Sequence, residues 1–412
     1  MEASDAGRAS SQFKEKMEKG VEAWDIHLSL FPAVQRVLNP PFINPHLPKM
    51  YRIYRDFVPY ILKEDMPPLV QLEITEYAKR EKLGKIPKGA LLASSVSFRE
   101  VESAIRRQDM EKTATLMATF YSQRGGKEFS RRLLLLGSGF LDASLGHSIS
   151  CTAFILLEMI ERAEQDPWPA ITTLADYFCK GRFHTTPGLR KRAPFPSDEA
   201  IKHHLPRATS GRGIVNLHHT ITVYAIERVR QFFSQEEYDH LIQAWIAFIG
   251  DKKADQIVLD RPRMDPPQDY KQFFEVFSNL DAKSTVALLR GLTISEEGRR
   301  RLGRFLIKGV ADLYQGNYNP HYLTGLGSTL WVVEKYWNQT FIVINALFQY
   351  LDFFFTGISL RFLIVLPRRE FFNREARSFL YICSTQGIEF HRGATHHLPC
   401  FNVHDFYLKE PA

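Results

Sequence analysis

The stretch LGHSISCTAFILLE, residues 145–158, combines a helical apolar pattern with a histidine near its start. On an α-helix, His147 shares one face with Cys151, Phe154 and Ile155, which follow it by four, seven and eight residues. This pattern predicts a helix whose face below the histidine is buried in the protein core.

The same periodicity dominates the rest of the chain. It continues almost without interruption through residues 98–160 and returns in residues 217–233, 270–290 and 295–314. Period-2 alternation with β-branched residues, which is typical of strands, is scarce. We therefore predict an all-α fold, organised as a single large multi-helical domain with a histidine-lined central pocket.

Composition divides the chain into segments. Residues 1–20 are polar and charged and predict a flexible N-terminus, and residues 21–366 form the predicted helical domain. Within that domain, residues 181–214 are rich in Pro, Arg and His, which predicts a long irregular insert that covers a pocket as a lid. Residues 367–412 predict an irregular C-terminal tail.

Residues 341–366 approach the length and apolarity of a membrane span. Asp352 and Arg361 interrupt the segment, and a single carboxylate at mid-bilayer costs about 2.5–3.5 kcal/mol on insertion scales. Two buried core helices fit this pattern better than a span, so we do not expect a membrane as a partner.

Charge and cysteine content narrow the partners and the compartment. The chain of 412 residues has 53 basic and 46 acidic residues, and its net charge of +7 is spread along the sequence. Such a modest charge does not indicate nucleic acid as a partner. The four cysteines form no C-x-x-C pair, and the N-terminus lacks the cationic and apolar regions of a secretory signal. We expect a cytoplasmic protein without disulfides.

The tripeptide Asn-Pro-His occurs twice, ending at His46 and at His321. Proline is favoured in the first turn of a helix, so each histidine should lie near a helix N-terminus. There the helix dipole lowers the pKa of an imidazole and keeps the ring neutral. His147 and the pair formed by His218 and His219 also begin helical stretches. Neutral imidazoles from several helices are suitable ligands for a buried non-haem metal.

The sequence leaves open which of two adjacent histidines points inward. The helix face of His218 is an apolar stripe that includes Ile221 and Ala225, which favours an inward position. His219 has a more mixed face, but it shares the pattern H-x-x-T with His321. Each histidine taken alone could also be an ordinary core residue.

Three segments resemble the histidine motifs of the questin-oxidase-like family, in order and broad spacing, over about residues 40–340. They are NPHLP at 44–48, LGHSI at 145–149 and YNPHYLTG at 318–325. The family consists of fungal and bacterial oxidoreductases, several of which act on anthraquinones in aromatic polyketide pathways. The resemblance implies a helical fold and an O₂-dependent opening of a quinone ring by oxygen insertion or dioxygenation. In some members it implies iron held by several histidines together with a modified lysine.

The resemblance also implies roles for particular residues. The candidate iron ligands are His46, His147 and His321, with His218 or His219 as a fourth. Glu158, downstream in the second motif, and Lys308, thirteen residues before His321, become candidate catalytic residues. The first motif has Lys49 where a second histidine is expected.

Together these observations predict an oxygenase that acts on a polycyclic aromatic substrate at a histidine-bound iron. An electron donor such as NADPH would act from solution or through a partner, because the chain has no nucleotide-binding motif. One alternative is a non-catalytic helical scaffold, in which the histidines are core or capping residues. Another is a membrane-associated protein anchored by residues 341–366.

Overall fold

The computed structural model describes most of the first 362 residues. The described ranges are 6–40, 42–84, 86–162, 166–189, 196–257, 262–279, 282–313 and 319–362. Within them the chain forms helices and no strand, apart from two isolated bridges that join Val37 to Lys82 and Asn39 to Phe42. The predicted all-α class is confirmed. The chain divides into two compact units, Met1–Ile358 and Ser359–Ala412.

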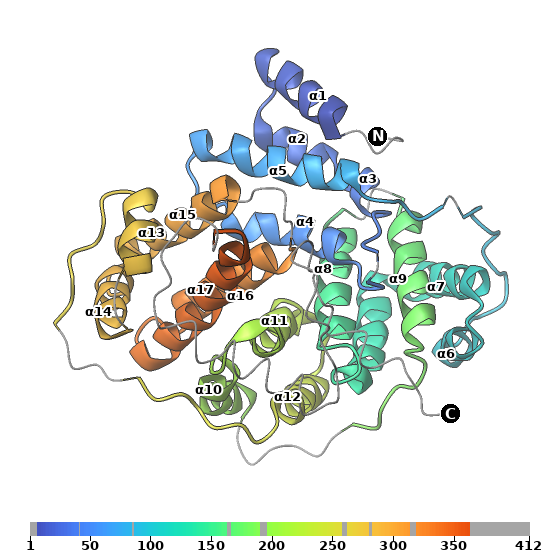
Figure 1. Ribbon diagram of the computed structural model, residues 1–412. Helices are drawn as coiled ribbons and strands as arrows, with labels where there is room; N and C mark the ends of the chain where they lie inside the picture. Colours follow the sequence, from blue (N-terminus) through green and yellow to red (C-terminus); the bar gives the residue numbers. More distant parts are fainter. Residues whose placement is uncertain are drawn as a thin grey trace, which may run out of the picture. The chain divides into compact units, whose positions relative to one another are not determined.

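Helices follow one another along the described parts of the chain (Figure 1). The first are α1 (Ala6–Glu18), α2 (Ala23–Ser29), α3 (Phe31–Val34), α4 (His46–Phe57), η1 (Lys63–Asp65), α5 (Met66–Lys79), α6 (Phe98–Arg106) and α7 (Met110–Gly137). Next come η2 (Ser138–Phe140), α8 (His147–Glu161), α9 (Trp168–Gly181), α10 (Ser197–Ala208), α11 (Gly213–Arg228), η3 (Arg230–Phe232) and α12 (Gln235–Ile249). The last are α13 (Tyr270–Asn279), α14 (Ala282–Thr293), α15 (Glu296–Leu313), α16 (His321–Lys335) and α17 (Thr340–Phe362).

Four of these helices pack around a common centre in the first unit. Helix α4 packs against α8 and α16, and α11 packs against the same two helices (Figure 1). Gly325 lets α16 approach α11 closely, because a Cβ atom at this position would lie 2.7 Å from Leu217 Cδ2. Leu217 immediately precedes His218, so this contact brings two of the predicted ligand-bearing segments together.

Three of the four helices begin at a histidine. His46, His147 and His321 are the first residues of α4, α8 and α16. Pro45 and Pro320 occupy the N-cap positions before the first and the last of these, where a missing N–H leaves no helical hydrogen bond unmade. The predicted placement of both Asn-Pro-His histidines at helix N-termini is confirmed.

Two expectations about irregular segments are wrong for the described residues. Residues 6–18 form α1, which buries Ala9 and Phe13 against the core and packs on α5, so this part of the N-terminus is not frayed. The insert at residues 181–214 contains α10, which packs against α11 and α12. Both helices bury apolar residues that composition alone obscured. Residues 190–195, within the expected lid, and the tail at 367–412 lie outside the described residues.

Residues 340–362 form one helix, α17, rather than the two that were expected. Among the described residues, no helix combines the length and apolarity that crossing a membrane requires. Asn345 and Gln349 on α17 are both buried, and the Gln349 amide donates to the carbonyl oxygens of Ala208 and Ser210. The polar residues of this segment are therefore used to dock α17 within the protein.

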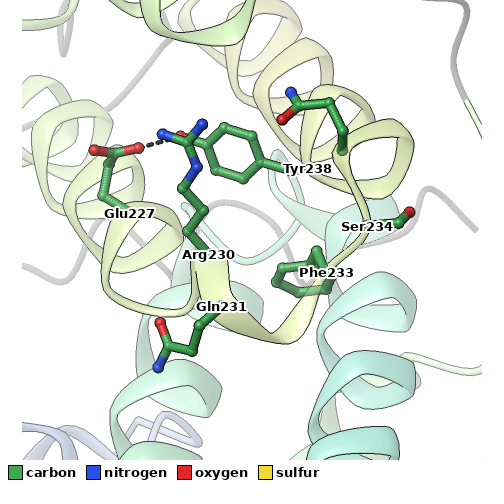
Figure 2. Close-up of a pocket in the computed structure, with 7 residues that line it drawn as sticks. Glu227, Arg230, Gln231, Phe233, Ser234 and Tyr238 are labelled. Atoms are coloured by element: carbon green, nitrogen blue, oxygen red, sulfur yellow. Dashed lines mark hydrogen bonds between the residues drawn. The ribbon is translucent and has the colours of Figure 1, made fainter.

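A cavity of about 540 Å³ lies where α11 ends and α12 begins (Figure 2). At the edge of the cavity, the Arg230 guanidinium lies over the Tyr238 ring, 4.5 Å from the ring centroid. Glu227 accepts a hydrogen bond from the Tyr238 hydroxyl. Glu227 follows His218 by nine residues on α11, a rise of about 13 Å. This cavity is therefore separate from the histidines.

Replacing Gly146 with alanine should destabilise the junction of α8 and α11. Gly146 is the N-cap of α8 in a left-handed conformation (φ 75°), and a Cβ there would collide with the Thr222 hydroxyl. Backbone strain and overpacking together should lower the free energy of unfolding by about 2–4 kcal/mol. Urea denaturation of the purified variant measures this change.

Gly20→Ala provides the matched control for backbone strain alone. Gly20 also has a positive φ, of 80°, but a Cβ there would have no atom within 4 Å. Gly20→Ala should lower the free energy of unfolding by only about 1 kcal/mol. Equal losses in the two variants would contradict the proposed contact between Gly146 and Thr222.

Candidate metal centre

Four of the predicted histidines meet at one point. The Nε2 atom of His147 lies 2.7 Å from that of His46, 3.1 Å from that of His218 and 3.4 Å from that of His321. The Nε2 atoms of His218 and His321 are 3.0 Å apart. Each residue is at most 6% exposed. The predicted convergence of residues that span 275 positions (321 minus 46) is confirmed.

The rings meet by their edges and not by their faces. Neighbouring imidazole planes are inclined to one another by 67° to 88°. Aromatic packing alone does not require the Nε2 atoms to converge. Binding of these nitrogens to one metal ion does require it. Ring nitrogens of His46, His147 and His321 thus lie within 4.8 Å of one another and form a group that could hold a metal ion, and His218 Nε2 lies beside two of these rings.

Hydrogen bonds on the far side of three rings fix their tautomers. Nδ1–H of His147 donates to the carbonyl oxygen of Ser144, and Nδ1–H of His218 donates to that of Ile214, both at 2.7 Å. Nδ1–H of His321 donates to Asn319 Oδ1, also at 2.7 Å. A neutral imidazole carries one N–H, so these three rings present a lone pair from Nε2 to the centre.

His46 completes the set through a different partner. Its Nδ1 lies 3.1 Å from the amide nitrogen of Asn39, which as placed would donate to it. In that state His46 carries its proton on Nε2 and can donate it to His147. A metal on His46 Nε2 requires the other tautomer, in which the ring donates from Nδ1 to the amide oxygen of a turned Asn39.

Burial opposes protonation of His147. It lowers the pKa of His147 well below its ordinary value of 6.5, and the neighbouring His218, Lys49 and His321 lower it further. Lone pairs about 3 Å apart cannot hydrogen-bond one another, and unsatisfied polar groups are costly in a buried site. A shared cation would satisfy all of them.

The spacing fits a metal ion. Metal–imidazole bonds of about 2.0–2.1 Å place two donors about 2.8–3.0 Å apart at 90° and about 3.3–3.4 Å apart at the tetrahedral angle. The separations of 2.7, 3.0 and 3.1 Å are closer to the first range, and the fourth, 3.4 Å, to the second. These separations are closer to those of ligands at about 90° to one another than to those of a closed tetrahedral site.

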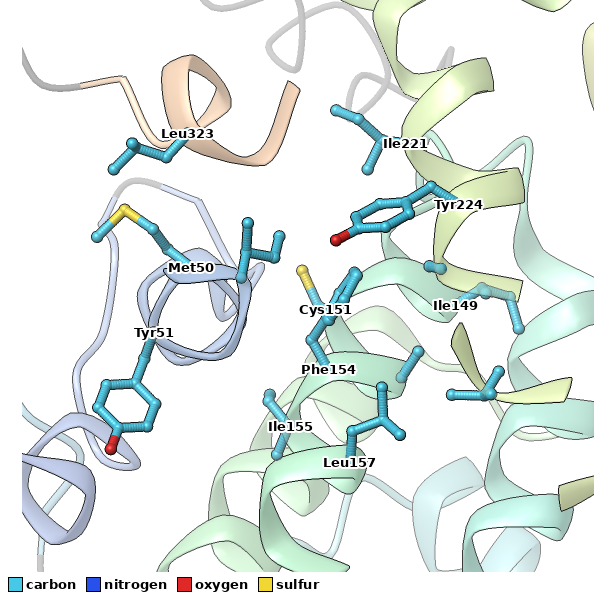
Figure 3. Close-up of a cluster of buried hydrophobic side chains, with 14 of the residues drawn as sticks. Met50, Tyr51, Ile149, Cys151, Phe154, Ile155, Leu157, Ile221, Tyr224 and Leu323 are labelled. Atoms are coloured by element: carbon cyan, nitrogen blue, oxygen red, sulfur yellow. The ribbon is translucent and has the colours of Figure 1, made fainter. Parts of the chain in front are cut away.

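Below the histidines the four helices pack apolar side chains against one another (Figure 3). Met50 of α4 and Leu323 of α16 lie toward one another, and Cys151 of α8 lies between α4 and α11, which carries Ile221. Such packing limits side-chain motion, so the imidazoles above it are held in fixed orientations. Cys151 is a free, buried thiol in this apolar layer.

Lys49 is the residue near the centre that sequence analysis noted only as a departure from the motif. It lies one turn beyond His46 on α4, is completely buried, and donates from Nζ to Ser150 Oγ at 3.1 Å. Burial lowers its pKa to about 8. Within the described residues no carboxylate pairs with it. The signal in the sequence was its spacing of three residues from His46, which puts both on one helix face.

His219 does not join the other histidines. Its ring packs edge-on against Phe248, and its Nδ1 accepts a hydrogen bond from Lys252 Nζ at 3.1 Å. Adjacent residues on a helix point about 100° apart, so only one of His218 and His219 can face the centre. The structure corrects the candidate ligand set by selecting His218.

Glu158 lies at the other end of α8 from the centre. It follows His147 by eleven residues, a rise of about 16 Å. Arg55 donates to it at 2.6 Å and Arg162 at 2.5 Å, and Arg52 lies 3.5 Å away. The structure therefore gives this carboxylate a role in packing and not the catalytic role expected of it.

Lys308 also contacts residues other than the histidines. Its Nζ pairs with Asp65 at 2.8 Å and lies over the ring of Tyr270. The side chain is 31% exposed, in contrast to the buried histidines. The catalytic assignment of Lys308 is not supported, because an ion pair with Asp65 holds its amine away from them.

The asparagines behind two of the histidine rings, Asn39 and Asn319, were also not predicted, although Asn319 belongs to one of the tripeptides. Asn319 binds the ring of His321, but Asn44, at the matching position, offers only its carbonyl oxygen to the backbone N–H of His46. Asn39, five residues earlier, faces the His46 ring instead. Identical tripeptides thus place their histidines alike but support them differently.

Comparison with protein-family models, curated proteins and solved structures finds no match to this chain. The resemblance to the questin-oxidase-like family therefore rests on the three sequence motifs. Function has to be argued from the centre itself.

Asn319→Ala should weaken metal binding without unfolding the protein. The substitution removes the acceptor that orients His321 and fixes its tautomer. Loss of such a partner lowers metal affinity by about 10–100-fold. Competition with a chromophoric chelator measures the affinity, and Asn338→Ala, an exposed asparagine just after the same helix, is the control. Unchanged affinity in Asn319→Ala would contradict this role.

His219→Gln should remove part of the acid sensitivity of the metal-free protein. Burial, with the charge of Lys252, lowers the pKa of His219 to about 3, whereas an unfolded histidine titrates near 6.5. The unfolded state therefore gains a proton first, and stability falls as the pH drops from about 6.5 toward 3. Between pH 7.5 and 5.5, the wild type should lose about 1.4 kcal/mol more than the variant in urea denaturation. Identical pH profiles would refute this.

Proposed function

We propose that the chain is a metal-dependent oxidoreductase whose centre is formed by His46, His147, His218 and His321. The observation that carries the proposal is the set of three Nδ1–H donors, which turn three Nε2 lone pairs toward one buried point. Neutral imidazole suits several first-row metals, and iron is the metal that the family resemblance favours.

The proposed reaction is the O₂-dependent oxygenation or ring cleavage of a polycyclic aromatic of the anthraquinone type. A bound ferrous ion would supply a site at which O₂ can react with an organic substrate. The protein contributes orientation, since each ligand is fixed by its own hydrogen bond, and a low-dielectric surrounding that excludes water. An electron donor such as NADPH would act from solution or through a partner protein. We place this activity in the cytoplasm, where Cys151 and Cys179 stay reduced.

Coordination geometry distinguishes this function from a purely structural metal. Structural zinc sites are closed by four tetrahedral ligands, whereas catalytic centres keep a position open. Most of the Nε2 separations here favour angles near 90°, which supports an open centre. In a scaffold whose histidines only fill the core, buried lone pairs that face one another would not stabilise the fold.

His147→Ala tests the proposal most directly, because His147 contacts all three other ligands. It should lower metal affinity by more than about a hundredfold and abolish O₂ consumption with hydroxyanthraquinone substrates, while circular dichroism stays unchanged. Elemental analysis of anaerobically purified protein measures the metal. His219→Ala is the matched control and should retain both metal and activity.

Two results would contradict the proposal. Protein that takes up no stoichiometric metal under anaerobic loading would support the scaffold. Metal bound tightly without any O₂ consumption across a set of quinones and hydroquinones would indicate a structural metal site.

A further inference from the structure

A second layer of polar side chains lies one helical turn beyond the histidines. Lys49 on α4, Ser150 on α8 and Thr324 on α16 each follow a ligand histidine by three residues, which places them on the same helix face. Lys49 Nζ reaches across from α4 to Ser150 Oγ. The Thr324 hydroxyl is fully buried, and within the described part of the chain it has no hydrogen-bond partner. This layer therefore holds more donors than acceptors.

Charge in and around this layer is also unbalanced. The metal-ligating group among the described residues consists of histidines alone, without a carboxylate. A divalent ion together with the ammonium of Lys49 would bring three positive charges into a buried space, where uncompensated charge is costly. The N-termini of α4, α8 and α16 converge on the same point and add their positive dipole ends.

We propose that the centre binds a small monoanion, a carboxylate or an inorganic anion of similar size, between the metal and the Lys49 ammonium. This inference rests on the proposed function, because it requires a metal on the histidines. The anion would occupy an open position on the metal and accept a hydrogen bond from Lys49 Nζ. Thr324 supplies a second buried hydroxyl on the α16 side. The anion offsets charge that the protein itself leaves uncompensated.

Azide titration of cobalt(II)-loaded protein tests the proposal through the visible absorption of the metal. The wild type should bind azide saturably, and Lys49→Met should bind it at least about tenfold more weakly, as expected for loss of a charge-assisted hydrogen bond. Methionine is close to lysine in length and carries no charge, and replacing a buried ion by an apolar group is often tolerated. Lys49→Gln, which can still bond Ser150, is the second neutral variant if methionine disturbs folding.

Lys252→Met is the matched control. Lys252 is also largely buried, but its Nζ bonds Ser210, Asn216 and His219 and not the ligand histidines. Its replacement should leave the azide affinity within twofold of the wild type. A comparable loss in Lys252→Met and Lys49→Met would overturn the proposal, since the effect would then come from general disturbance of the core.

The affinity for cobalt(II) itself gives a readout that a structural role for Lys49 would not produce. Without azide, Lys49→Met should bind cobalt more tightly than the wild type, because a repelling charge has been removed. Azide should raise cobalt affinity in both proteins, and by at least about tenfold more in the wild type, because the coupling between two ligands is reciprocal. A structural role would weaken cobalt binding under both conditions.

Three outcomes would overturn the inference while leaving the proposed function intact. They are cobalt binding without any azide binding, equal azide affinity in the wild type and Lys49→Met, and a covalent modification of Lys49 found by peptide mass spectrometry. Failure of the wild type to bind any metal is a different result, because it would remove the proposed function itself.

Discussion

Lone pairs of buried imidazoles that face one another across about 3 Å impose the constraint around which this chain is organised. Water cannot separate them, and burial opposes the protonation of His147 that would let one ring donate to the next. The arrangement survives only because the apolar layer beneath it and the hydrogen bond behind each ring hold the rings in place. A cation bound at the meeting point, as proposed above, would turn this repulsion into attraction, and metal binding and folding would then stabilise one another.

Placing a histidine at the first residue of a helix helps to bring several rings to one point. The first residue of a helix has its side chain at the end of the element, next to the preceding loop, and its Nδ1 can reach loop acceptors such as Ser144 and Asn319. His218, in the interior of α11, uses the carbonyl oxygen of Ile214 one turn back. Three ligands at helix ends and one within a helix let four elements approach a single point without crossing one another.

The sequence predicted the helical class and the four histidines that lie together, because both depend on short-range patterns. Helical periodicity and the Asn-Pro-His tripeptides are local signals. The sequence could not show which of His218 and His219 faces the other histidines, because this depends on how α11 is rotated against α8 and α16. It also could not show that Glu158 pairs with Arg55 and Lys308 with Asp65, because these partners lie 103 and 243 residues away in the chain. Asn39 was missed for a similar reason, because a loop conformation brings it to His46.

The ion pairs of Glu158 indicate a role in holding two helices together. Helices α4 and α8 both begin at the centre, where His46 meets His147, and both run away from it. Near their far ends, Arg55 of α4 is joined to Glu158 and Glu161 of α8. Glu158 is buried, whereas Arg55 and Glu161 are partly exposed, and together the pairs oppose sliding of one helix along the other. A shift of one residue along either helix would move its histidine by about 1.5 Å, enough to separate donors that must share one metal. Glu158 is thus a positioning residue that acts through the helix it anchors.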